Sequence, residues 1–428
     1  MVAFRMRKCA GVATCGCRKV IEFLLPAQSS EPLDALLGRV AAARGRLPFS
    51  ELAMEFVGSV SRGILTDRRF RGYPELMAMA DWFRPINLRD LRQQFLGGTE
   101  LTQHRYLRRG VVFHIAPSNV DSVFIYSWLL SLLCGNANIA RVSTRRTVQM
   151  QAFFYTTATL LQREEYKELA DANLVLSYEH NVTLTEKISS HCQLRVIWGG
   201  DNTVRQIRAI PLPPLSMEIA FANRFSLAVI EANALLSLDR AGLVALAHAF
   251  YNDAFWFAQQ ACSSPRAVIW IGDNQTNNHA RSLFWSAVAE QVRQRSPENL
   301  PGQVMNRTTT LFRLACEHAG AQADTPPGAM PSRILVSELI AEDRICHDGN
   351  GLFIEIERPN LVDIIGMLSL RDQTIAHFGF ARAQWLELLA DLPPHAADRI
   401  VPIGEALAFS PVWDGVNLLR SFTREVRI

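Results

Sequence analysis

The stretch that decides the fold is Gly110-Val-Val-Phe-His-Ile-Ala-Pro117-Ser118-Asn119, in which a short apolar run ends in a proline turn. Short apolar runs bounded by turn residues are typical of buried strands. Predicted helices and strands alternate after it, with helices over residues 121–134, 147–164 and 183–190 and strands over residues 138–143, 173–178 and 194–198. This alternation with short connections predicts a parallel sheet covered by helices on both faces, which is an α/β fold.

A second alternating region begins near residue 234. An apolar helical run ends shortly before Cys262, and strands are expected over residues 266–271 and 352–357. A helix is expected between them, over residues 278–294. The last residues, 422–428, alternate as a half-buried strand does.

Composition excludes several classes of protein. The chain has 428 residues, of which 49% are hydrophobic and 20% charged, as in ordinary globular proteins with substantial cores. A formal charge of +3 is too small to indicate nucleic-acid binding. The longest apolar run, residues 123–134, is too short to span a membrane. Residues 1–20 lack the apolar centre of a secretory signal, so we expect a cytoplasmic protein.

Eight cysteines show no paired framework, and a cytoplasmic setting would keep them reduced. Cys9, Cys15 and Cys17 form a cluster that is either a partial metal site or part of a mobile tail. We favour the tail, because no second Cys or His pair lies at a suitable spacing, and we expect no metal site.

Cys262 stands in Gln259-Gln-Ala-Cys-Ser-Ser-Pro265, between the helical run and the following strand. A cysteine thiolate is a strong nucleophile toward acyl carbonyls, with which it forms a thioester. A lone cysteine is otherwise usually buried and inert. The junction and its polar neighbours favour the nucleophile.

Asn119 follows the turn at Pro117 and directly precedes a helix. Its amide is positioned either to stabilise a developing oxyanion or to cap the helix. Asp121 provides an alternative cap, which leaves Asn119 available for catalysis.

These segments, in this order, resemble the aldehyde dehydrogenase superfamily. The best resemblance is to its reductive branch, the long-chain fatty acyl-CoA reductases of the bacterial bioluminescence type, and it runs from about residue 105 to the C-terminus. It implies two Rossmann-like parallel-sheet domains and a C-terminal oligomerisation strand. The implied division is an N-terminal helical region (1–104), a cofactor domain (105–233), a catalytic domain (234–395) and a returning C-terminal segment (396–428).

The resemblance also implies roles for individual residues. Cys262 takes the acyl group, while Asn119 and the Cys262 backbone N–H stabilise the oxyanion. In Arg141-Val-Ser143-Thr144, Arg141 matches a lysine and Thr144 a glutamate that usually contacts the cofactor ribose. A ribose site with an arginine and no carboxylate favours NADPH, with its extra phosphate. The alternative is a solvated basic start to the next helix.

Gly199-Gly200-Asp201-Asn-Thr203 opens a predicted helix after a strand, at the edge of the sheet where such folds bind ligands. By resemblance, Gly199, Gly200 and Thr203 receive the cofactor pyrophosphate on a helix N-terminus. Asp201 departs from the superfamily pattern, because a carboxylate competes with phosphate unless it turns away.

Two superfamily glutamates are missing. The one that activates water for hydrolysis of the acyl enzyme falls at Ala220, unless the register shifts by two to Glu218, which is otherwise an edge carboxylate. The second missing glutamate is the one that holds the nicotinamide ribose in the superfamily. No residue of 344–351 can be assigned that role. Segments 398–404 and 413–415 also resemble the reductases, but turn formation is the only role evident from their residues.

The sequence therefore predicts an NADPH-dependent acyl-CoA reductase that forms an aldehyde through an acyl-Cys262 intermediate. Its expected partners are an acyl-CoA or acyl-carrier substrate, an acyl-protein synthetase and further copies of the chain. The alternatives are an NAD(P)-dependent aldehyde dehydrogenase working in the oxidative direction and a non-catalytic nucleotide-binding scaffold. Phe255, Trp256 and Phe257 are expected either to line an acyl tunnel or to pack in the core.

Overall fold

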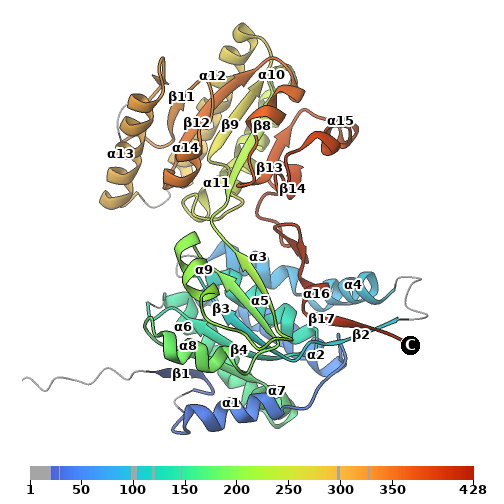
Figure 1. Cartoon of the computed structure of the whole chain (residues 1–428). Helices are drawn as coiled ribbons and strands as arrows, with labels where there is room; N and C mark the ends of the chain where they lie inside the picture. Colours follow the sequence, from blue (N-terminus) through green and yellow to red (C-terminus); the bar gives the residue numbers. More distant parts are fainter. Residues whose placement is uncertain are drawn as a thin grey trace, which may run out of the picture.

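The computed structural model describes residues 21–27, 29–97, 104–117, 121–145, 147–295, 299–325 and 328–428. It forms two lobes, each built around a sheet, and the chain returns to the first lobe at its C-terminus (Figure 1). The cysteine cluster at residues 9–17 and the predicted site residue Asn119 lie outside the described residues.

The first sheet has six strands, all parallel except the edge strand β1. Their order across the sheet is β1 (Glu22–Leu25), β5 (Asn173–Ser177), β4 (Ala137–Val142), β3 (Val111–Ile115), β6 (Leu194–Trp198), β7 (Met217–Phe221). The chain runs outward from β3 on one side and from β6 on the other, so the topological switch point lies between these strands. Ligands of open α/β sheets bind at the carboxyl ends beside such a point.

Helices cover this sheet and build the N-terminal region: α1 (Leu33–Ala42), α2 (Glu51–Thr66), α3 (Pro74–Trp82), α4 (Pro85–Leu96), α5 (Asp121–Leu133), α6 (Val148–Leu161), α7 (Lys167–Asp171), α8 (Val182–Ser189), α9 (Asp201–Arg208). Local sequence sets where they begin: the Thr147 side chain accepts from the Met150 N–H at the start of α6, and Asn181 does the same for α8. Helix α5 is apolar on all sides because α2 and α3 cover the face that the sheet leaves free.

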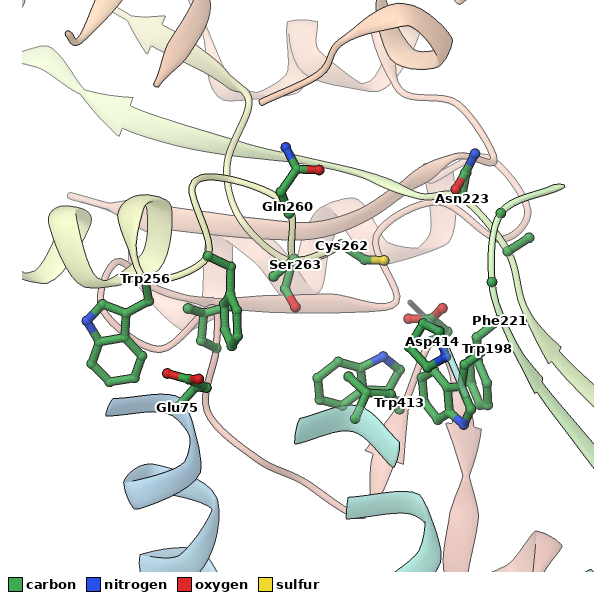
Figure 2. Close-up of a pocket in the computed structure, with 18 of the residues that line it drawn as sticks. Glu75, Trp198, Phe221, Asn223, Trp256, Gln260, Cys262, Ser263, Trp413 and Asp414 are labelled. Carbon is green, nitrogen blue, oxygen red and sulfur yellow. The ribbon is translucent and has the colours of Figure 1, made fainter. Parts of the chain in front are cut away.

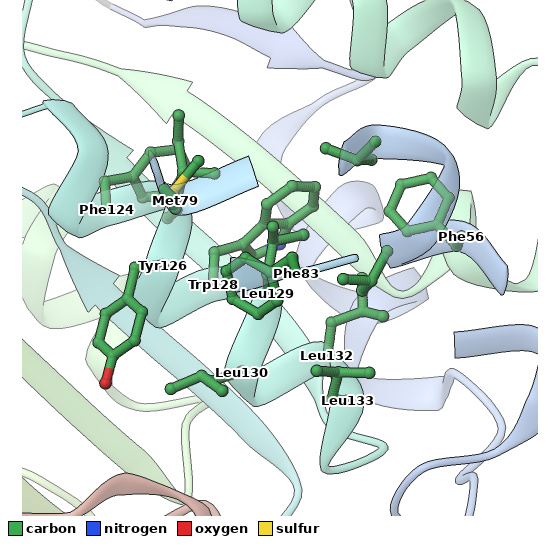
Figure 3. Packing of buried hydrophobic residues seen from close by; sticks show 14 of the residues in the cluster. Phe56, Met79, Phe83, Phe124, Tyr126, Trp128, Leu129, Leu130, Leu132 and Leu133 are labelled. Carbon is green, nitrogen blue, oxygen red and sulfur yellow. The ribbon is translucent and has the colours of Figure 1, made fainter. Parts of the chain in front are cut away.

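The core of the first lobe is centred on α5 (Figure 3). Trp128 is fully buried between the rings of Phe56 and Phe124, and its indole N–H donates to Asn173 Oδ1 at 2.7 Å. His114 on β3 is also buried, with hydrogen-bond contacts to Ser127 and Asn138, and burial lowers its pKa to about 4. His114 is therefore a core histidine.

The second sheet has seven strands, parallel except for the edge strand β10. Their order is β10 (Gln322–Ala323), β11 (Ser332–Leu335), β12 (Leu352–Arg358), β9 (Ala267–Ile271), β8 (Phe225–Glu231), β13 (Asp372–Phe378), β14 (Arg399–Pro402). The helices of this lobe are α10 (Ala232–Leu236), α11 (Arg240–Phe255), α12 (Asn274–Arg295), α13 (Pro301–Glu317), α14 (Ala341–Cys346), α15 (Arg382–Leu388).

The chain crosses between the sheets over residues 222–224, ahead of the predicted boundary between residues 233 and 234. The reason is that β8 pairs with β9 and β13 in the second sheet. At the other end of the chain, β14 still belongs to the second sheet, and the residues after it return to the first lobe. The predicted division into four segments stays a prediction.

The returning segment contains the short hairpin β15 (Val412–Trp413) and β16 (Val416–Asn417), then α16 (Leu418–Ser421) and β17 (Thr423–Arg427). The last strand pairs antiparallel with β2 (His104–Arg108), so the predicted terminal strand is present. Asp253 on α11 fixes the start of this segment, because its carboxylate accepts from the Gly404 and Ala406 N–H groups at 2.6 and 3.1 Å.

Candidate active site

Cys262 lies on an irregular loop, residues 256–266, that connects α11 to β9. The loop reverses direction through Ala258 and Gln259, which adopt φ values of +49° and +60°. Such left-handed conformations cost about 1–3 kcal/mol for ordinary side chains and persist only where surrounding contacts enforce them.

Gln259 supplies much of that enforcement. Its side chain is fully buried: Oε1 accepts from the Gly351 N–H at 2.7 Å, and Nε2 donates to the carbonyls of Pro265 and Leu352 at 2.9 and 3.0 Å. Its backbone carbonyl accepts from the Arg266 guanidinium. The first glutamine of the Gln-Gln-Ala-Cys segment therefore ties the cysteine loop to β12.

Residues 348–351, to which no role could be assigned from sequence, hold the same loop from the other side. The Asn350 N–H donates to the Ala258 carbonyl at 2.8 Å, and Gln260 Nε2 donates to the Asp348 carbonyl at 2.5 Å. At Gly349, which has a φ of +72°, a Cβ would meet the Ala258 carbonyl oxygen at 2.9 Å. The segment therefore holds the loop that carries Cys262.

The Cys262 thiol faces a cavity between the lobes (Figure 2). Burial raises the pKa of the thiol, and the Asp414 carboxylate raises it further. Arg266, the backbone N–H of Arg224 and the Arg224 guanidinium act in the opposite direction. The resting side chain is therefore a neutral thiol, and reaction with an acyl carbonyl requires the loss of its proton.

The walls of the cavity come from both lobes and are mainly apolar. They consist of Glu75, Pro117, Val123, Trp198, Gly199, Gly200, Phe221, Ala222, Asn223, Trp256, Phe257, Gln260, Ala261, Cys262, Ser263, Leu407, Phe409, Trp413, Asp414. The Trp198 and Phe221 rings stack with centroids 3.8 Å apart, and Trp413 packs edge-on against Trp198. Of the three aromatic residues expected at a tunnel or in the core, Trp256 and Phe257 line the cavity, while Phe255 packs on Phe353 in the core.

Two polar side chains of the cavity could not be recognised from sequence. Asp414, within the segment assigned to a turn, projects its carboxylate into the cavity beside Cys262 (Figure 2). The Ser263 hydroxyl is buried, also points into the cavity and has no partner among the described residues. The sequence signal that could have identified Asp414 is the Trp-Asp-Gly triplet at residues 413–415, in a segment that resembles the reductases.

The glycine segment of the first lobe lies in this same cavity. Gly200 precedes α9 without a side-chain cap, and a Cβ there would meet Asn223 at 3.3 Å. Asp201 turns away, because its carboxylate accepts from the Asn223 N–H at 3.2 Å and pairs with Arg371 at 2.7 Å. The predicted competition with a phosphate is thereby relieved. The Gly199 N–H is already bonded to the Phe221 carbonyl.

The predicted ribose segment lies at a second, smaller cavity. Ser143 lines it together with Arg145 and Pro117, and Pro117 also lines the cavity of Cys262. Arg141 donates to the Tyr178 carbonyl at 3.3 Å and lies over the Tyr178 ring, while its Nε is buried without a partner among the described residues. Thr144 is exposed. In the structure, Gly199 and Gly200 line the same cavity as Cys262. Ser143, in the segment that also contains Arg141 and Thr144, lines the second cavity, and Pro117 lines both.

The strand with the missing glutamate contributes no carboxylate to the cavity. Phe221 of β7 lines it, whereas Glu218 pairs with Arg195 and Arg208, with N–O distances of 2.7 Å and 3.0 Å. Glu218 is thus an edge carboxylate and is not a base for Cys262. Arg224, which follows β7, pairs with Asp398 and donates to the His395 carbonyl.

No group of three or more His, Cys, Asp or Glu side chains that could hold a metal ion occurs among the described residues. None of the helices in that part of the chain is both long and apolar enough to cross a membrane.

Comparisons with known proteins agree with this geometry. Residues 76–310 match the model of the acyl-CoA reductase (LuxC) family. The chain is 27% identical over 169 residues to the long-chain acyl-protein thioester reductase of Aliivibrio fischeri, which is 39% of this chain and 33% of that protein. With the enzyme of that name from Vibrio harveyi it shares 21% identity over 277 residues, 60% of this chain and 55% of that one. The matches thus span about a third to about half of these relatives.

Solved structures show the same fold at low identity. An oxidoreductase from Marinobacter aquaeolei superposes with a TM-score of 0.66 at 12% identity, covering 93% of this chain and 91% of that one. The glyceraldehyde-3-phosphate dehydrogenase GapN from Methanocaldococcus jannaschii, solved with NADP, gives a TM-score of 0.65 at 10% identity, covering 96% and 97%. The predicted relationship is confirmed: the chain belongs to the acyl-CoA reductase (LuxC) family and has the aldehyde dehydrogenase fold.

Proposed function

We propose that the protein is an NADPH-dependent reductase that converts an acyl thioester into an aldehyde through an acyl-Cys262 intermediate. One observation carries the proposal: the Cys262 thiol and the glycine segment at the start of α9 face the same cavity from opposite lobes. A cysteine sulfur and a dinucleotide held in this way both reach the carbonyl carbon of a bound acyl group. Reduction of an enzyme-bound thioester requires this arrangement.

The acyl group is held by this chain's aromatic wall. Trp256, Phe257 and Phe409 line the cavity, and apolar walls of this kind suit a fatty acyl chain. The donor is an acyl-CoA or an acyl group on a carrier protein. An acyl-protein synthetase, as in the bioluminescence system, is a suitable supplier of the second kind of donor.

The residues perform the acyl transfer in a simple sequence. The Cys262 sulfur attacks the acyl carbonyl carbon, and the donor's thiol leaves. Asn119, through its side chain, and Cys262, through its backbone N–H, stabilise the oxyanion of the tetrahedral intermediate. Bound NADPH supplies a hydride for the second half-reaction, in which Cys262 leaves and the aldehyde forms. Ala220 stands where the oxidising relatives carry a water-activating glutamate, so the thioester persists until it is reduced.

The residues present fit a dinucleotide cofactor. Gly200 leaves the start of α9 open, and the buried Nε of Arg141 remains available near the smaller cavity. We assign the pyrophosphate to Gly199, Gly200 and Thr203 and the phosphorylated ribose to Arg141, Ser143 and Thr144. The exposed Thr144 carries no charge that would repel a 2′-phosphate, which favours NADPH over NADH.

The β2–β17 ribbon extends from the first lobe, and we propose that it joins copies of the chain (Figure 1). A two-stranded ribbon leaves both outer edges open for pairing with another copy. Light scattering at several protein concentrations tests this: a monomer at all of them contradicts the homo-oligomer.

The function is tested by incubation with acyl-CoAs of increasing length and NADPH, following the loss of NADPH absorbance and the appearance of aldehyde. Without NADPH, a long-chain acyl-CoA is expected to add one acyl mass to the peptide that contains Cys262. Cys262→Ala abolishes labelling and reduction, whereas the control Cys346→Ala, at an exposed cysteine, retains both. Labelling of another residue, or reduction by Cys262→Ala at a near-normal rate, contradicts the proposal.

A further inference from the structure

Asp414 occupies a position that a simple turn residue does not need. It lies between β15 and β16 with a φ of +47°, and its carboxylate points into the cavity, on the side that faces the Cys262 sulfur (Figure 2). The left-handed backbone aims the side chain inward. Asparagine tolerates this conformation as well as aspartate does, so the amide can replace the carboxylate without new strain.

The surroundings of Asp414 are mostly apolar but hold the carboxylate in place. Gln373 on β13 donates a hydrogen bond from Nε2 to Asp414 Oδ1. Trp413 and Trp198 form the neighbouring wall. Burial, with a smaller contribution from Asp398, raises the pKa of Asp414 to about 6, against the opposing effects of Arg224 and Gln373. Cys262 and the buried Tyr126 also interact electrostatically with Asp414.

Acyl transfer to Cys262 involves two proton movements. The thiol must lose a proton before the sulfur attacks, since its pKa is raised in the cavity. The leaving thiolate of the donor must gain one. A single group beside the sulfur, with an affinity for protons between those of an ordinary carboxyl and a thiol, suits both movements.

We propose that Asp414 carries the proton of acyl transfer from the Cys262 thiol to the sulfur of the departing donor thiol. In the first step the carboxylate accepts the thiol proton while a carbon–sulfur bond forms between Cys262 and the acyl carbonyl carbon. In the second step the bond between that carbon and the donor sulfur breaks, and the Asp414 carboxyl protonates the departing thiolate. No electron is gained or lost, and Asp414 is again ionised. The inference rests on the proposed function and adds a catalytic residue to it.

The same carboxylate has a second conceivable use, the activation of water against the acyl enzyme. The observations favour the proton carrier, because the carboxylate lies among Trp198, Phe221 and Trp413, which leave little polar surface to hold a water molecule. Hydrolysis of the labelled enzyme separates the two roles experimentally.

The test compares wild type with Asp414→Asn in single-turnover acylation, without NADPH. With a long-chain acyl-CoA at pH 7, the variant is expected to release coenzyme A about 10²–10⁴-fold more slowly. With the 4-nitrophenyl ester of the same acid, whose leaving group needs no proton, the loss is expected to be much smaller. The pKa of Cys262, read from the pH dependence of its alkylation by iodoacetamide, is expected to fall, because a negative charge beside the thiol is removed.

Together, the three measurements on Asp414→Asn distinguish a role of Asp414 in proton transfer from a role in folding of the site. A Cys262 pKa that does not fall, or equal losses with both acyl donors, overturns the proposal, because either result marks general damage to the site. Normal acylation combined with slower hydrolysis of the labelled enzyme also overturns it and assigns Asp414 to water. Glu75→Gln, at a second carboxylate that lines the cavity, is the matched control and should show no dependence on the leaving group.

A second variant covers the case in which Asp414→Asn fails to fold. Gln373→Leu keeps the volume but removes the donor to Asp414, which raises the pKa of the carboxyl. The rise of the acylation rate with pH, expected near pH 6 in wild type, should move to higher pH. An unmoved profile contradicts the inference. Wild type that is never labelled by acyl-CoA refutes the proposed function, whereas labelled wild type with an unaffected Asp414→Asn variant refutes the proton transfer alone.

Discussion

Replacement of Gln259 by alanine tests whether one buried amide holds the cysteine loop in place. The substitution removes one acceptor and two donated hydrogen bonds, to the Gly351 N–H and to the Pro265 and Leu352 carbonyls. An unsatisfied buried N–H costs about 1–3 kcal/mol, and each lost bond to a carbonyl costs about 0.5–1.5 kcal/mol. Together these give a loss of about 4 kcal/mol. For a cooperative unit of about 150–250 residues, this corresponds to a fall in Tm of about 10 °C.

The neighbouring residue provides the control. Gln260 is only partly buried and makes one side-chain bond, to the Asp348 carbonyl. Gln260→Ala is therefore expected to cost about 1 kcal/mol or less. Thermal unfolding, followed by circular dichroism, measures both variants.

A local readout accompanies the thermal one. Ala258 and Gln259 hold left-handed conformations that relax once the amide is gone, so the rate of Cys262 alkylation by iodoacetamide should change in Gln259→Ala and not in Gln260→Ala. If Gln259→Ala melts within about 2 °C of Gln260→Ala and alkylates at the wild-type rate, the amide does not determine the loop conformation.

Four further outcomes are expected. Thr144→Glu raises the apparent Michaelis constant for NADPH more than that for NADH, because a carboxylate repels the 2′-phosphate. Steady-state kinetics with both cofactors measures the two constants, and equal changes contradict the prediction. Burial raises the pKa of Asp253 to about 7, so its contribution to stability is present below pH 4 and is lost as the pH rises through 7. Melting curves from pH 5 to 8 should therefore show a weaker dependence on pH for Asp253→Asn than for wild type. Asn119→Ala raises the activation free energy of acylation by about 2.7–4 kcal/mol if its amide donates to the oxyanion. A variant that lowers Tm without slowing acylation shows instead that Asn119 caps the following helix. Arg371→Ala weakens NADPH binding while acylation of Cys262 by acyl-CoA changes by about five-fold or less, because one partly exposed ion pair is worth about 1 kcal/mol or less; a larger fall in acylation contradicts this.

Much of the fold could be predicted because the informative elements are long or apolar. The strand at residues 194–198 has the predicted bounds, and the buried helix beginning at Asp121 ends within one residue of the prediction. A helix that is apolar all round can only be buried, so its place in the core followed from its composition. The point at which the chain passes from one sheet to the other is less evident from sequence, because β7 and β8 are similar short apolar strands and pairing with distant strands decides which sheet each joins.

The site was predictable where its chemistry is local. The cysteine and its flanking residues form one continuous segment, and the glycines before α9 form another. Asp414 lies far along the chain from Cys262, in a hairpin whose composition indicates a turn and nothing more. Residues 348–351 act through backbone groups, which any sequence possesses, so the part they play in holding the cysteine loop leaves almost no trace in residue types.

The two proposed half-reactions depend on different parts of this architecture. Cys262 is tied to β12 through Gln259, and Asp414 is bonded to β13 through Gln373, so the two groups to which we assign the proton transfer are both held by the second sheet. The glycine segment belongs to the first sheet, and the ion pair between Asp201 and Arg371 links it to the second lobe. The proposed proton transfer therefore depends on contacts with the second sheet, whereas the proposed reduction also requires a correct separation of the lobes. A change at the link between them should impair reduction and leave the labelled intermediate to accumulate.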